Sequence, residues 1–175
     1  MLNRVLISNR GEIAIRIARA AASLGMESVA IFAAADAAAL HTRIADDARE
    51  IAADGDPVRA YLDAAAIVAA AQASGCDCVH PGYGFLAENA AFAERCAAAG
   101  LTFVGPPPAV LALFGDKVRA RGLAQSLAIP VIPGSREPLD SPEQAMALAE
   151  IAYPATLKRR PAAGAACAGC PAVTR

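Results

Sequence analysis

The chain has 175 residues, which is enough for one domain, or for one domain and part of a second. Its formal net charge is −1 and 19% of its residues are charged, so neither a nucleic acid nor an anionic membrane surface is the expected partner. No apolar run reaches the roughly 18 residues of a membrane span, and no basic leader precedes an apolar segment, which predicts a cytoplasmic protein.

Short runs rich in β-branched residues alternate with alanine-rich stretches of helical length. Such an alternation requires crossover connections, so it predicts an α/β fold: a doubly wound parallel sheet with helices on both faces. The predicted strands are residues 4–8, 28–32, 48–51, 77–80 and 102–104.

The first predicted helix follows the first strand. It carries Ile13, Ile17 and Leu24 on one face, at spacings of four and seven, and Gly25 is expected to end it as a C-terminal cap. Further helices are predicted over residues 62–73 and, after the fourth strand, up to residue 99.

A proline cluster at residues 105–108 can neither continue a helix nor pair in a sheet, so it predicts a domain boundary. The expected division is a first domain over 1–106, the beginning of a second over 107–158, and an aberrant or disordered tail over 159–175. Helices at 109–114, at 116–127 and from Ser141, and a strand at 155–158, are predicted beyond the boundary.

Two turns stand between a strand and a helix. The first, Asn9-Arg10-Gly11-Glu12, is placed either to bind an anion at the helix N-terminus or to act as a structural turn. In the second, Gly82 and Gly84 flank a tyrosine, and their freedom to adopt positive φ would hold that side chain in the open. A strand-end turn with a locally packed tyrosine is the alternative.

Cys76, Cys78 and Cys96 fall within predicted regular structure, where a thiol behaves as a small buried hydrophobe, so we expect them to be reduced. His80 and His41 have no second ligand near them in sequence, and neither is assigned to a metal.

Three stretches in this order resemble the biotin carboxylase family: residues 8–14, the run His80-Pro81-Gly82-Tyr83-Gly84-Phe85-Leu86-Ala87-Glu88-Asn89, and Gly115-Asp116-Lys117-Val118. The resemblance covers about residues 1–158. It implies a Rossmann-like pre-ATP-grasp domain followed by an incomplete ATP-grasp segment.

The resemblance also implies roles for particular residues. Tyr83, with Gly82 and Gly84, would border the ureido ring of biotin, and Lys117 and Lys158 would contact ATP. Exposed lysines without a ligand are the alternative for both. Arg16 and Arg19 would lie near a dimer contact or be solvated, and Ser23 stands where an acidic partner is expected.

The implied reaction is the ATP-dependent carboxylation of biotin by bicarbonate, with Mg²⁺ bound to ATP, as in acetyl-CoA carboxylase. Implied partners are a biotin carboxyl carrier protein or domain, a carboxyltransferase and a second copy of the chain. Because the family's metal and bicarbonate ligands lie downstream, the chain is not expected to turn over by itself. A non-catalytic assembly or dimerisation module, or another ATP-grasp ligase, is the alternative.

The resemblance stops after Lys158, where the family has a glycine-rich phosphate loop. Residues 159–170 contain none of that loop, but suitable codons for them encode four consecutive glycines in another reading frame. Our hypothesis is a frameshift just after Lys158, which would make the pair Cys167 and Cys170 an accident of the frame; a metal or redox role for the pair is the alternative.

Overall fold

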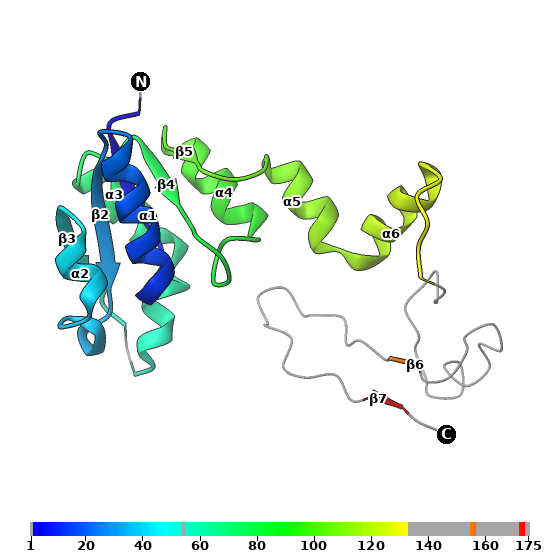
Figure 1. The fold of residues 1–175 in the computed structure, drawn as a ribbon, viewed down its shortest axis with the longest axis horizontal. Helices are drawn as coiled ribbons and strands as arrows, with labels where there is room; N and C mark the ends of the chain where they lie inside the picture. The colour runs from blue at the N-terminus through cyan, green and yellow to red at the C-terminus, as the bar shows by residue number, and fades with distance from the viewer. Residues whose placement is uncertain (1, 54, 133–154, 157–171, 174–175) are drawn as a thin grey trace. The chain divides into compact units, whose positions relative to one another are not determined.

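In a computed structural model of the protein, the described residues are 2–53, 55–132, 155–156 and 172–173. The chain divides into two compact units, residues 1–112 and residues 113–175 (Figure 1). The division into domains at residues 106 and 158 stays a prediction.

The first unit is built on a parallel sheet. Among the described residues, five strands form it in the order β3-β2-β1-β4-β5, and every neighbouring pair is parallel. Their bounds are β1 Arg4–Ile7, β2 Glu27–Phe32, β3 Asp47–Glu50, β4 Cys78–His80 and β5 Thr102–Phe103. The chain adds strands on one side of β1 and then on the other, so the predicted doubly wound sheet is confirmed.

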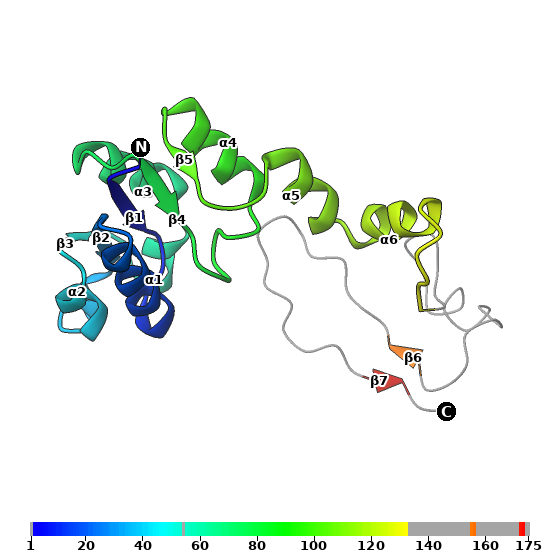
Figure 2. The ribbon, with the colours of Figure 1, turned by 45° about the horizontal axis from the view of Figure 1, so that its top comes forward.

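Helices cover both faces of this sheet (Figures 1 and 2). On one face α1 (Gly11–Ser23) packs against β1, and α2 (Leu40–Ile44) lies beside α1. On the other face α3 (Ala64–Ala73) and α4 (Ala90–Ala98) bury their apolar residues. Two 3₁₀ helices, η1 (Ala34–Asp36) and η2 (Pro57–Tyr61), follow β2 and β3.

The alternation of side chains along β1 divides the core. Leu6 faces α3 and α4 in the larger cluster, whereas Val5 and Ile7 face the small residues of α1. Phe92 of α4 is fully buried and meets the Phe103 ring edge-to-face, with ring centroids 5.9 Å apart. The sheet therefore separates a larger core cluster beside α3 and α4 from two smaller clusters beside α1.

The placement of Leu24 on the same helical face as Ile13 and Ile17 is wrong. Leu24 is 76% exposed, because α1 ends at Ser23 and Gly25, with φ of 72°, turns the chain away. The buried stripe of α1 consists of Ala14, Ile17, Ala18 and Ala21. Gly25 does end the helix as predicted.

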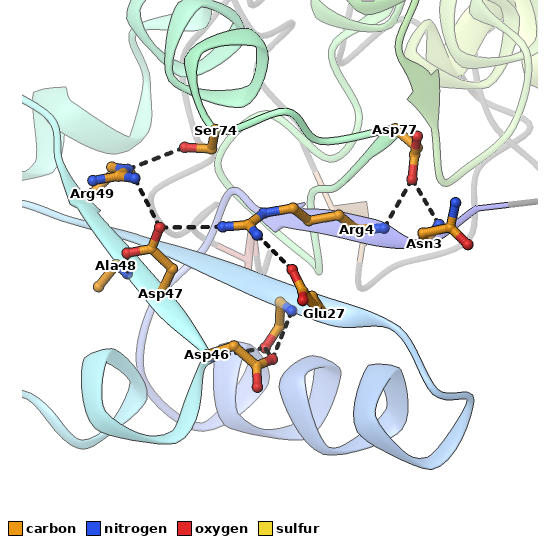
Figure 3. A network of polar contacts seen from close by, with 10 residues as sticks. Asn3, Arg4, Glu27, Asp46, Asp47, Ala48, Arg49, Ser74 and Asp77 are labelled. Atoms are coloured by element: carbon orange, nitrogen blue, oxygen red, sulfur yellow. Dashed lines mark hydrogen bonds and ion pairs between the residues drawn. The ribbon is translucent and has the colours of Figure 1, made fainter.

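A polar network ties the strands together at their amino ends (Figure 3). The Arg4 guanidinium pairs with Glu27 and with Asp47, and Arg49 also pairs with Asp47. The Asp77 carboxylate accepts hydrogen bonds from the main-chain N–H groups of residues 3 and 4, which hold its pKa below the usual range. These contacts lie at the edge opposite to the glycine-flanked turn.

In the second unit, α6 (Lys117–Ser126) begins at Asp116, whose carboxylate accepts hydrogen bonds from two N–H groups of its first turn. α6 and α5 (Pro108–Gly115) confirm the two helices predicted after the proline cluster. β6 (Ala155–Thr156) pairs antiparallel with β7 (Ala172–Val173). The helix predicted from Ser141 lies outside the described residues. None of the helices that the structure describes has the length and apolarity to cross a bilayer.

Candidate functional site

The two turns singled out in the sequence meet at the carboxyl edge of the sheet. They follow β1 and β4, which are neighbours, and the Ser8 N–H donates to the His80 carbonyl at 3.0 Å where both strands end. The chain's connections leave β1 and β4 toward opposite sides of the sheet. In open α/β sheets, ligands bind at such a reversal of strand order.

The loop after β4 has an unusual backbone. Gly82 and Gly84 have φ of 66° and 68°, as their predicted freedom suggests, and Phe85 also has a positive φ of 42°. Between the glycines, the Tyr83 side chain is 64% exposed, so it is held in the open rather than packed locally. Its hydroxyl donates a long hydrogen bond, 3.5 Å, to Glu12 Oε2 at the start of α1.

Asn9 joins the two turns. Its side chain is buried, and its amide nitrogen donates to the carbonyl oxygens of Pro81 and Tyr83, each at 2.8 Å. A Cβ at position 82 would lie 2.9 Å from that nitrogen, so glycine is required there by space as well as by φ. The first turn thus supports the loop after β4 by hydrogen bonds, a contact that the sequence did not indicate.

Beside the loop, Arg10 contacts two aromatic rings and a carboxylate. Its guanidinium carbon lies 5.3 Å from the Tyr61 ring centroid and 5.8 Å from that of Phe85, and the two rings stack. Tyr61 donates to Asp36 at 2.7 Å, and Arg10 pairs with the same carboxylate. These contacts lower the pKa of Asp36, whereas burial and the carboxylate raise the pKa of Tyr61.

His80, the last residue of β4, supports the loop through its ring. Its Nδ1 accepts a hydrogen bond from the Gly82 N–H at 3.0 Å, which requires that nitrogen to be unprotonated. Burial lowers the pKa of His80. The imidazole is therefore a structural acceptor within the loop.

Replacing His80 with asparagine is expected to flatten the pH dependence of stability. As the pH falls below about 7, the unfolded chain binds a proton on His80 before the folded chain does, so the wild type loses stability, by at most about 1.4 kcal/mol per pH unit. An asparagine side chain keeps an acceptor oxygen at this position and cannot titrate. Urea unfolding followed by circular dichroism between about pH 7.5 and 5.5 measures this, and parallel curves for the two proteins would contradict it.

The remaining predicted site residues are not part of the loop after β4. Arg16 and Arg19 are exposed on α1, form no ion pair with any described residue, and line a groove between α1 and α2. Lys117 is exposed at the start of α6, in the second unit. Lys158 lies outside the described residues. Gly82, Tyr83 and Gly84 thus form the loop after β4, while Arg16 and Arg19 line a groove that also includes Glu12, the hydrogen-bond partner of Tyr83.

Thiol and metal chemistry have little support among the described residues. Cys76, Cys78 and Cys96 are free and buried, as predicted, and burial raises the pKa of Cys78 and of Cys96 to about 11. Thiols that stay protonated at neutral pH are poor nucleophiles. Residues 2–53, 55–132, 155–156 and 172–173 contain no group of three or more metal-ligating side chains.

Comparison with known proteins gives a consistent result. Residues 1–111 match the family model described as "Biotin carboxylase, N-terminal domain". Biotin carboxylase of Pseudomonas aeruginosa is 46% identical over 160 residues, and biotin carboxylase 1 of Bacillus subtilis is 45% identical over 159 residues; each alignment covers 90% of this chain.

Solved structures agree with these sequence matches. The biotin carboxylase domain of a single-chain bacterial carboxylase is 56% identical, with a TM-score of 0.75 over 83% of this chain and 33% of that chain. The biotin carboxylase domain of Hydrogenobacter thermophilus 2-oxoglutarate carboxylase, solved as a dimer with MgADP, ADP and bicarbonate, is 41% identical, with a TM-score of 0.85 over 95% and 36%.

The chain spans about a third of the two bacterial biotin carboxylases named above, 35% of the length of each. The match to the family model covers 111 of the 175 residues, including both turns at the carboxyl edge of the sheet. This chain belongs to the biotin carboxylase family, whose N-terminal domain it contains.

Proposed function

We propose that this chain supplies the N-terminal part of an ATP-dependent biotin carboxylase, in which the loop Gly82-Tyr83-Gly84 borders biotin. The observation that carries the proposal is the exposed Tyr83 side chain on a loop that Asn9 binds through two main-chain carbonyls, where the strand order reverses. The family match over the same residues supports it.

In the proposed site the chain's residues bind and position rather than react. The exposed Tyr83 ring offers a flat apolar surface for the ureido ring of biotin, while its hydroxyl stays near Glu12. Lys117, and Lys158 by resemblance, would place compact positive charges near the ATP phosphates. Such positioning lowers the activation barrier, because the reactants lose their translational and rotational freedom on binding, before the reaction takes place.

The described residues do not fit a resident Mg²⁺ site, because they contain no cluster of three or more metal-ligating side chains. No step through that ion is therefore assigned to this part of the chain. The relative solved with MgADP and bicarbonate supports ATP and bicarbonate as substrates of the proposed complete enzyme. Its partners would be a biotin carrier and a carboxyltransferase.

An assembly module is the second candidate. The groove between α1 and α2 presents the exposed Arg16 and Arg19 beside Leu40, which is 57% exposed, and the relative from Hydrogenobacter thermophilus was solved as a dimer. Under this proposal the groove would serve as a contact with a second copy of the chain.

A hybrid carboxylase tests the two candidates. In this hybrid, residues 1–111 of the chain replace the matching residues of Pseudomonas aeruginosa biotin carboxylase. We expect ATP hydrolysis that depends on bicarbonate and biotin, within about tenfold of the intact relative, a barrier difference of ~1.4 kcal/mol.

The intact Pseudomonas enzyme is the control for this assay, and sedimentation analysis reports the assembly of both proteins. A folded, dimeric hybrid without biotin-dependent hydrolysis would favour the assembly module. A folded hybrid that neither dimerises nor hydrolyses ATP would contradict both candidates.

A further inference from the structure

The Asn9 side chain uses both of its donors and its acceptor oxygen on the two turns. An asparagine amide offers two N–H donors and a carbonyl acceptor. The donors bind the Pro81 and Tyr83 carbonyl oxygens at 2.8 Å each, and Oδ1 accepts from the Arg10 N–H at 2.9 Å. The side chain is 3% exposed, so water is a poor substitute for any of these partners.

The spacing around Asn9 admits few other side chains. Aspartate would present an oxygen to two carbonyl oxygens, and alanine would leave both carbonyls without their donor. From the loop side, a Cβ at position 82 would lie 2.9 Å from Asn9 Nδ2 and 3.0 Å from Ile13 Cγ1. Asn9 and Gly82 therefore form a matched pair across the carboxyl edge of the sheet.

The neighbouring residue holds the other end of the loop. Arg10 lies over the rings of Tyr61 and Phe85, and Phe85 is the non-glycine residue of this loop with a positive φ. Two consecutive residues of the first turn thus contact the loop on both sides of Gly84: Asn9 binds main-chain carbonyls before it, and Arg10 lies over the Phe85 ring after it. What remains exposed between the two contacts is the Tyr83 side chain.

We infer that Asn9 is a positioning residue for the biotin-site loop: by binding the carbonyls on both sides of Gly82, it fixes the direction in which Tyr83 points. The inference rests on the proposed function for the identity of the ligand. The positioning itself rests on contacts within the chain, so the two can fail separately.

The first test uses the 175-residue chain. We expect Asn9→Asp to lower the ¹⁵N order parameters of Gly82, Tyr83 and Gly84 from about 0.85 to below about 0.6, while the amides of β1 and β4 keep their values. Asn89→Ala is the matched control, because Asn89 caps α4 through the Phe92 N–H at 3.0 Å without binding these carbonyls.

A second pair of variants decides the matter if Asn9→Asp does not fold. Gly82→Ala pushes a Cβ against the Asn9 amide and should mobilise the loop in the same way. Gly84→Ala is the control for this variant. Gly84 has a similar φ of 68°, but a Cβ there would have nothing within 4 Å, so this variant shows the effect of backbone strain without a contact with Asn9. A loop that stays rigid in folded Asn9→Asp, or in Gly82→Ala when Asn9→Asp does not fold, would overturn the inference.

The hybrid carboxylase supplies the functional readout. Asn9→Asp is expected to raise KM for biotin about tenfold through misplacement of Tyr83, with KM for ATP unchanged. Equal changes in both constants would indicate a general structural role and overturn the inference. An inactive unsubstituted hybrid would count against the proposed function, and the order parameters would still decide whether Asn9 positions the loop.

Discussion

Replacing Phe92 with alanine is expected to lower the free energy of unfolding by ~3–5 kcal/mol, the usual cost of removing a buried phenylalanine ring. Phe92 is fully buried between α4 and the sheet, in the same cluster as Leu6 and Ile67, and its ring meets Phe103 edge-to-face. Because the cluster joins both helices of that face, little local collapse can fill the cavity.

Leu24→Ala is the control for this variant. Leu24 is also a large apolar residue near a helix end of the first unit, but it is 76% exposed, so its replacement should change stability by less than about 0.5 kcal/mol. Urea unfolding followed by far-ultraviolet circular dichroism gives both values. A loss for Leu24→Ala as large as that for Phe92→Ala would show that the core is wrongly placed.

Much of the sheet could be predicted because each strand is a short apolar run set between helical stretches. Buried strands such as β1 and β2 can be recognised from their own apolar residues, without knowing which strand pairs with them. The helical crossover connections between them then require parallel pairing. By contrast, α2 and η2 were missed, because five-residue helices in an alanine-rich segment carry no readable period. Leu24 was misassigned because its spacing fits the helix while the helix stops before it.

The candidate site could be predicted only in part. Positive φ at Gly82 and Gly84 follows from the residue type, and that prediction needed no tertiary contact. The support of the loop by Asn9 links residues 72 and 74 positions apart, and nothing local in the sequence indicates such a pairing. The stacking of Phe85 on Tyr61 was invisible for the same reason.

Replacing Tyr83 with alanine in the hybrid carboxylase is expected to weaken the binding of biotin strongly. The Tyr83 ring is exposed on a loop whose main chain is bound by Asn9 and whose Phe85 ring lies under Arg10, so removing the Tyr83 ring deletes a contact surface and leaves the loop in place. Aromatic side chains at the centre of a binding site commonly contribute about 2 kcal/mol or more to binding. We therefore expect KM for biotin to rise by at least about tenfold, with stability and KM for ATP nearly unchanged.

Whether the loop Gly82-Tyr83-Gly84 borders biotin is decided by KM for biotin and KM for ATP, measured for the hybrid with and without Tyr83→Ala. Tyr83→Phe is the matched control, because it keeps the ring and removes only the long hydrogen bond to Glu12. We expect a rise in KM for biotin alone, large for alanine and small for phenylalanine. An active hybrid in which Tyr83→Ala leaves KM for biotin unchanged would contradict it.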